Sequence, residues 1–203
     1  MELQTTVFGN GAEISAPDDV IPLCELAKAF EEAGEFESAV ETLRPFWNGV
    51  LHRPETTRLP DQAKAELLLR AGTLTGWLGS AKQIAGAQEA AKDLISESAA
   101  LFDTLGMSEK LAEARVDLAI CYWRESALDE ARITLRLVLD ALGETQSEQK
   151  LRALYNSAIV EKVATRDQEA FRIYQEIAPK FETCGNHSLK ARRLQCWRIR
   201  ATE

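Results

Sequence analysis

The fold is decided by the stretch "LAICYWRESALDEARITL", residues 118–135. An apolar helical face is followed by a polar turn without proline or glycine, and then by a second apolar face. The small residues Ala119 and Ala131 lie on either side of this turn, and the bulky Tyr122 stands between them. Because the distance between two packed helices depends on the side chains at their contact, the stretch predicts a helical hairpin that crosses at the two alanines.

The same pattern recurs elsewhere in the chain. In "LAKAFEEAGEFESAVETL", residues 26–43, every apolar position matches in kind, and Gly34 stands at the offset of Ser126. Ala158 and Ala170 begin a weaker copy. A partial copy around Gly72 fits only if about six or seven residues are inserted before its second helix. One hairpin cannot bury its apolar face alone, so repeated hairpins are expected to stack.

The composition agrees with an all-helical chain. Of the 203 residues, 45% are hydrophobic and 28% charged; Ala, Leu and Glu recur, which favours helix, and no alternating Val/Ile runs predict strands. We expect a stack of antiparallel helix pairs, with Pro45 shortening or bending the second helix. About nine helices are predicted, at approximately 20–34, 36–49, 61–78, 81–105, 108–124, 128–142, 147–163, 168–182 and 188–201.

Three regions follow from these boundaries. Residues 1–18 are expected to form an irregular arm, because glycines and the turn-prone "SAPDD" interrupt any period. Residues 19–186 should form an array of about four helix pairs. Residues 187–203 should form a terminal capping helix, whose basic side chains either face solvent or contact an acidic partner or nucleic acid.

This pattern resembles the tetratricopeptide repeat (TPR), which has small residues and aromatics at these helix positions. Two copies match well, at about 20–51 and 112–143, and two match in part, at about 65–105 and 151–182. The spacing between equivalent small residues is longer than the roughly 34 residues usual in the family. In this respect the chain is similar to the long-helix variants found in bacterial signalling and transcription regulators.

The resemblance implies a right-handed superhelical stack, an α-solenoid, with a concave groove that is lined by the first helix of each pair and binds a partner peptide or helix. The Lys/Asn carboxylate clamp of some members is absent, because Cys24 and Lys28 stand at its first two positions. Trp123 either anchors the ligand or packs between repeats. Carried over to this chain, the groove positions predict a largely apolar and aromatic lining with cations at its ends: Lys28, Leu69, Thr73, Trp77, Val116, Ile120, Trp123, Arg152, Tyr155, Ile159 and Lys162.

The sequence predicts no catalytic, cofactor or metal site. Neither histidine, His52 or His187, accompanies a nucleophile motif, and no glycine-rich phosphate loop occurs. Cys184, His187 and Cys196 supply only three ligands with metal-like spacing, whereas a structural zinc site needs four.

The net charge of −8 argues against nucleic acid and anionic membranes as partners. The first residues do not resemble a secretory signal, no apolar run approaches a membrane span, and the four scattered cysteines suit a reducing cytoplasm. The leading hypothesis is a non-enzymatic protein–protein interaction module in the cytoplasm. A sensory or regulatory repeat domain and a homo-oligomerising scaffold are the alternatives.

Overall fold

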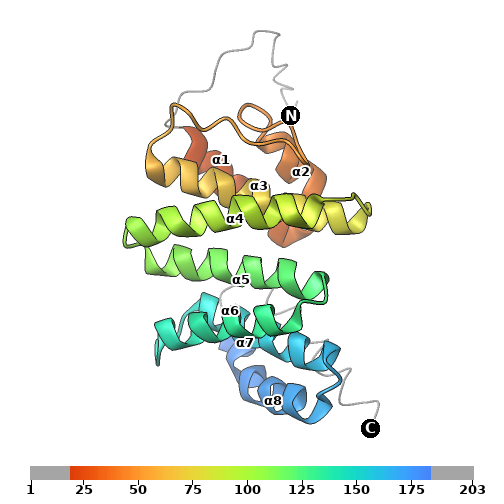
Figure 1. The fold of residues 1–203 in the computed structure, drawn as a ribbon. Coiled ribbons are helices and arrows are strands. Elements are labelled where there is room, and N and C mark those ends of the chain that lie inside the picture. The colour runs from red at the N-terminus through yellow and green to blue at the C-terminus, as the bar shows by residue number, and fades with distance from the viewer. Residues whose placement is uncertain (1–18, 184–203) are drawn as a thin grey trace, which may run out of the picture.

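The computed structural model describes residues 19–183, and this part of the chain consists of eight helices without strands (Figure 1). The all-α prediction is therefore confirmed. The predicted arm, the capping helix at 187–203 and its basic residues lie outside the described residues. The helices are α1 (Val20–Ala33), α2 (Phe36–Thr42), α3 (Asp61–Ala81), α4 (Ala87–Thr104), α5 (Ser108–Arg124), α6 (Leu128–Leu142), α7 (Glu148–Val163) and α8 (Asp167–Thr183).

The helices form four successive hairpins that stack in chain order (Figure 1). The pairs are α1 with α2, α3 with α4, α5 with α6, and α7 with α8. Neighbouring pairs contact through α4 on α5 and α6 on α7, while the first helices α1, α3, α5 and α7 also touch one another in succession. This is the stack of helix pairs that the repeated pattern predicts.

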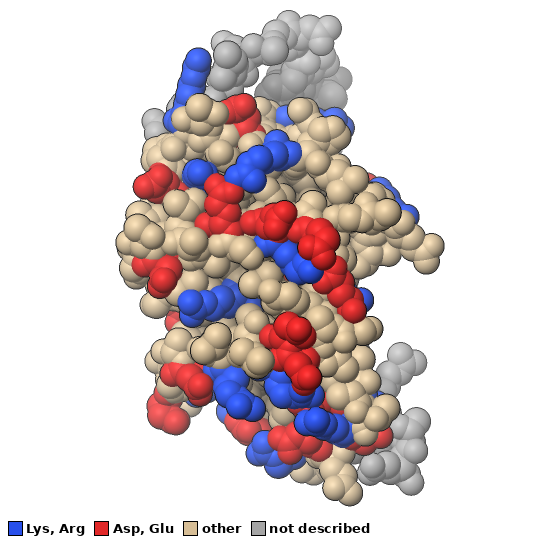
Figure 2. All heavy atoms as spheres, viewed as in Figure 1, with Lys and Arg blue, Asp and Glu red and all other residues tan. Residues whose placement is uncertain are grey.

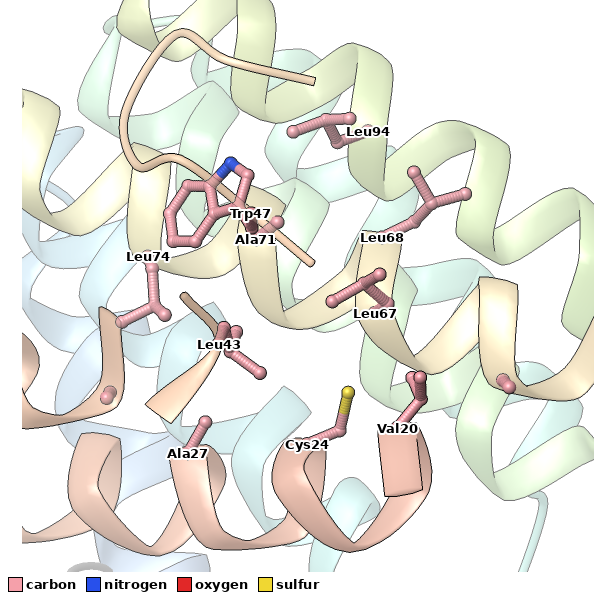
Figure 3. Close-up of a cluster of buried hydrophobic side chains, with 12 residues drawn as sticks. Val20, Cys24, Ala27, Leu43, Trp47, Leu67, Leu68, Ala71, Leu74 and Leu94 are labelled. Carbon is pink, nitrogen blue, oxygen red and sulfur yellow. The ribbon is translucent and has the colours of Figure 1, made fainter. Parts of the chain in front are cut away.

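The small residues of the pattern lie where the two helices of a pair meet. Ala119 and Ala131 are fully buried in one cluster with Leu135 and Val138. The equivalent alanines of the first and last pairs are equally buried. In the first pair, Figure 3 shows Ala27 in a cluster that also contains side chains of the following helix α3. The paired alanines predicted from residues 118–135 are therefore buried in one shared cluster in three of the four pairs.

The second pair crosses at glycines instead. A Cβ atom added to Gly72 would lie 2.6 Å from Ile95 Cγ1, and one added to Gly79 would lie 2.2 Å from Ala87 Cβ. Gly76 faces Ala91 across the same interface. Only hydrogen at Gly72 and Gly79 lets α3 and α4 approach so closely. α3 has 21 residues, against 14 in α1, 17 in α5 and 16 in α7, and this greater length accounts for the insertion in this copy.

Residues with positive φ lie in the turns that follow α1, α3 and α5. Gly34 ends α1 with φ +82°, and its equivalent Ser126 takes the same left-handed conformation with φ +64°. The predicted helix at 81–105 is wrong at its start, because Gln83 and Gly86 also have positive φ and a right-handed helix cannot pass through them. The chain turns there, and α4 begins at Ala87. The predicted shortening before Pro45 is confirmed, since α2 ends at Thr42.

Candidate functional site

A cavity of about 290 Å³ lies on the face shared by the first helices of all four pairs. Each of α1, α3, α5 and α7 contributes to its wall, together with the α1–α2 turn and the start of α2. The stack therefore creates this hollow, and no single hairpin contains it. Its lining residues are Lys28, Glu31, Glu32, Ala33, Gly34, Phe36, Arg70, Thr73, Trp77, Glu113, Asp117, Ile120, Glu148 and Arg152.

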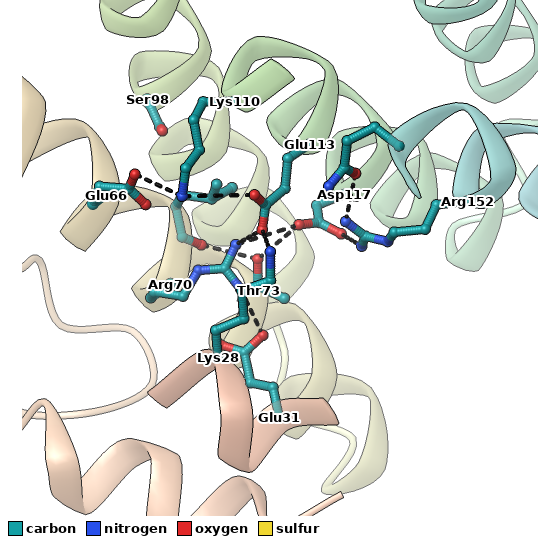
Figure 4. Close-up of polar contacts among 12 residues, drawn as sticks. Lys28, Glu31, Glu66, Arg70, Thr73, Ser98, Lys110, Glu113, Asp117 and Arg152 are labelled. Atoms are coloured by element: carbon teal, nitrogen blue, oxygen red, sulfur yellow. Dashed lines mark hydrogen bonds and ion pairs between the residues drawn. The ribbon is translucent and has the colours of Figure 1, made fainter. Parts of the chain in front are cut away.

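Arg70 is the centre of the polar wall. It lies in the middle of α3, where nearly every residue is buried, and it is only 3% exposed. Its Nη1 lies 2.9 Å from Glu31 Oε2 of α1, and its Nη2 lies 2.6 Å from Glu113 Oε1 of α5 (Figure 4). One guanidinium group therefore links three successive helix pairs.

Glu113 is the most strongly compensated acid of the site. Its Oε1 also accepts from Lys28 Nζ at 2.9 Å, and Lys110 lies near its second oxygen. Burial alone would raise the pKa of Glu113, but Arg70, Lys28 and the other nearby cations outweigh burial and lower it to about 2. This carboxylate is therefore held ionised inside the protein.

Asp117 extends the contacts to the fourth pair. It lies one turn after Glu113 in α5, and its Oδ1 accepts from Arg152 Nη2 of α7 at 2.6 Å. Its Oδ2 lies 3.4 Å from Thr73 Oγ1 of α3. Arg152 also donates through Nη1 to Gln149. We call the charged residues joined in this way the charge network: Lys28, Glu31, Glu66, Arg70, Lys110, Glu113, Asp117 and Arg152.

Glu31 is the least compensated acid of the charge network. Its Oε2 is bonded to Arg70, but its Oε1 is buried and has no hydrogen-bond donor among residues 19–183. Burial raises the pKa of Glu31 to about 7; Arg70 acts against this shift, and the negative charges of Asp117 and Glu113 add to it. Near neutral pH this carboxyl group therefore exchanges between its two protonation states.

An aromatic wall adjoins the charges. The rings of Phe36 and Trp77 stack with centroids 5.3 Å apart, and the guanidinium of Arg124 lies 3.8 Å from the Trp77 ring centroid. Ile120 of α5 adds aliphatic surface to the cavity. The cavity thus offers a charged side and an apolar side to one ligand.

Five of the residues predicted for the groove line this cavity: Lys28, Thr73, Trp77, Ile120 and Arg152. Two of them, Lys28 and Arg152, belong to the charge network. The lining differs from the expected apolar and aromatic one, because more than half of its side chains are charged.

The other six lie elsewhere in the array. Leu69 and Val116 are fully buried in the helix interfaces, and Tyr155 packs against the rings of Tyr174 and Phe181. The remaining three are not in the cavity wall either. Ile159 packs on the α7–α8 cluster, Trp123 packs on the α5–α6 cluster, and Lys162 pairs with Asp167.

Reasoning from the sequence missed Arg70, Glu113 and Asp117. A usable signal was present, because Arg70 is the only charged residue between Leu67 and Ala81. A helix that is apolar all round is buried, and a buried arginine needs acidic partners. Asp117 and Glu113, four residues apart in the next first helix, are on one helix face and could have been proposed as those partners.

The described part of the chain contains neither a group of three or more potential metal ligands nor a helix long and apolar enough to cross a membrane. The candidate set Cys184, His187 and Cys196 lies outside the described residues. Acidic and basic side chains are interspersed on the face that Figure 2 shows, rather than gathered by sign.

Comparison with known proteins supports the fold assignment. No family model matches the sequence, and no curated protein is similar to it in sequence. One matching solved structure contains TPR-like repeats, nearly identical to one another, of a Podospora anserina protein assigned to the kinesin light chains. It matches with a TM-score of 0.58 and 16% identity, over 93% of this chain and 90% of that chain. A glutamine-to-methionine variant of those repeats matches with a TM-score of 0.50 and 17% identity, over 92% and 89%. The chain therefore has the TPR-like fold that its repeated pattern predicts.

Proposed function

We propose that this protein is a non-enzymatic interaction module that holds a segment of a partner protein in the cavity of its first helices. The observation that carries the proposal is the cavity itself, which all four helix pairs build together. Its volume of about 290 Å³ is at the lower end of the range for ligand pockets. It accommodates an anchoring side chain, while the rest of the segment lies across the concave face.

The charge network favours a preformed binding surface. Arg70 and Asp117 join residues of all four first helices through buried contacts. Side chains fixed in this way lose little freedom when a ligand binds, which favours affinity. We also propose the cytoplasmic location expected from the sequence. The free thiols of Cys24 and Cys121, the two cysteines of the described residues, are compatible with a reducing compartment.

A substitution at the mouth of the cavity tests the proposal. Ala33 is exposed at the end of α1 and lines the cavity, so Ala33→Trp should obstruct it without disturbing the core. Peptides selected on the wild-type protein from a phage library of random peptides, each roughly a dozen residues long, should bind Ala33→Trp about tenfold more weakly or worse, a loss of at least about 1.4 kcal/mol. Fluorescence anisotropy with the synthetic peptides measures this loss.

The matched control is Ala100→Trp, which places the same side chain at an exposed position of α4 outside the cavity. It should bind the peptides as the wild type does, and both variants should melt at the wild-type temperature. Peptides that bind Ala33→Trp and Ala100→Trp equally well would place the interaction elsewhere and refute the proposal.

A further inference from the structure

We propose that the anchoring side chain is cationic: the cavity takes a lysine or arginine of the partner segment, whose charged head binds Glu31. This inference rests on the proposed function and adds the chemical class of the ligand. Three observations carry it, namely the balance of charge, the unpartnered carboxylate oxygen of Glu31 and the apolar part of the wall.

The charge of the lining favours a cation. Three cations line the cavity, and each is already engaged by a carboxylate: Arg70 by Glu31 and Glu113, Lys28 by Glu113, and Arg152 by Asp117. An anionic ligand would have to displace these contacts and approach an excess of acids. The carboxylates of the lining outnumber its cations and are Glu31, Glu32, Glu113, Asp117 and Glu148.

Glu31 supplies the specific contact. Its side chain is 9% exposed, and its Oε1 has no donor among the described residues. Leaving a buried acceptor without a donor costs about 1–3 kcal/mol, and more when the group is charged. An ammonium or guanidinium group in the cavity would add a positive charge beside Glu31. A turn of the carboxyl group toward the cavity would let this group donate to the unpartnered oxygen, which would offset that cost.

The rest of the wall suits the stem of such a side chain. Lysine and arginine carry their charge on several methylene groups, which bury well along apolar surface. Trp77 and Ile120 offer that surface in the same cavity as Glu31. A small apolar or purely anionic anchor would use only one side of this cavity.

Binding should depend on pH with a defined sign. A cation binds ionised Glu31, and burial holds the pKa of this group near 7 in the free protein. At pH 6 only about one-tenth of the molecules are ionised there, so the apparent affinity should be about tenfold lower than at pH 8. The groups that face Glu31 are Lys28 on its own helix, Arg70 of α3, Glu113 and Asp117 of α5 and Arg152 of α7.

The probe is a synthetic peptide from the same phage library that binds the wild-type protein and does not bind Ala33→Trp. We expect such peptides to share one lysine or arginine. When an essential arginine is replaced by citrulline, its neutral isostere, affinity for the wild type should fall about 30-fold or more. The Glu31→Gln variant should bind the arginine peptide weakly, with the same affinity at pH 6 and at pH 8. Replacing the arginine by citrulline should lower the affinity for this variant by less than about threefold.

Two outcomes overturn the inference. Cavity-dependent peptides without a common basic residue, or a citrulline effect equal in the wild type and in Glu31→Gln, would reject the cationic anchor while the interaction module survives. The absence of any cavity-dependent peptide would refute both proposals. Glu25→Gln, which removes an exposed carboxylate of the same helix outside the cavity wall, is the matched control and should keep the citrulline effect and the pH dependence.

Discussion

Replacing Arg70 with methionine should lower the free energy of unfolding by about 3–5 kcal/mol, because it leaves buried carboxylates without their cation. Methionine keeps an unbranched apolar stem, so the loss reports the charge rather than the volume. Glu31 and Glu113 lose a direct partner, and both are almost wholly inaccessible. Urea denaturation followed by circular dichroism at pH 7 measures the change.

Arg44→Met is the matched control. Arg44 pairs with Glu41 on the surface after α2, where both side chains are more than half exposed. Exposed pairs contribute about 0–1 kcal/mol, so this variant should be nearly as stable as the wild type. If Arg70→Met were no more destabilised than Arg44→Met, Arg70 would not be buried among acids as described.

Glu113→Gln should have an effect of similar size, with a characteristic pH dependence. The folded pKa of Glu113, about 2, lies below its ordinary value of 4.5. The stabilisation from its ionisation is therefore fully present above pH 4.5 and is lost as the pH falls through 2. This difference between the two pKa values corresponds to about 3 kcal/mol in the free energy of unfolding. Glu113→Gln should be less stable than the wild type by about this amount at pH 7, and the gap should narrow toward pH 2.

Glu31→Gln should behave in the opposite way, which makes it the best control. The folded pKa of Glu31, about 7, lies above its ordinary value, so the wild type loses stability as the pH rises from 4.5 through 7. Glutamine avoids this loss. The variant should match the wild type near pH 4.5 and exceed its stability at pH 8. Urea titrations at pH 4.5, 6 and 8 compare the two; equal effects of both substitutions at every pH would contradict the different environments of the two acids.

The sequence predicts the hairpins because their positions depend on local features. Ala119 and Ala131 mark a crossing that a periodic pattern reveals, and Gly34 marks a turn through its backbone freedom. The prediction failed at residues 81–86, where Gln83 adopts a left-handed conformation that its side chain does not require. The turn brings Ala87 of α4 against Gly79 of α3, a contact between helices that a local sequence pattern does not encode.

The site was less predictable for a related reason. The resemblance to the TPR family places residues on the concave face, and five of those predicted do line the cavity. It does not predict which side chains form buried pairs. Arg70 meets Glu113 across 43 residues of sequence, and such partners depend on the relative positions of separate helix pairs. The isolated charge of Arg70 within an apolar helix was the one local indication.

The most direct test of the account is a double-mutant cycle between Arg70→Met and Glu113→Gln. Our central claim is that first helices of successive pairs meet at one buried charge network, and these two residues join α3 to α5 at its centre. The account predicts that the two losses are not additive and that the coupling energy is about 2–3 kcal/mol. Losses that add to within about 0.5 kcal/mol would show that the two side chains do not interact, and would contradict the arrangement on which the cavity depends.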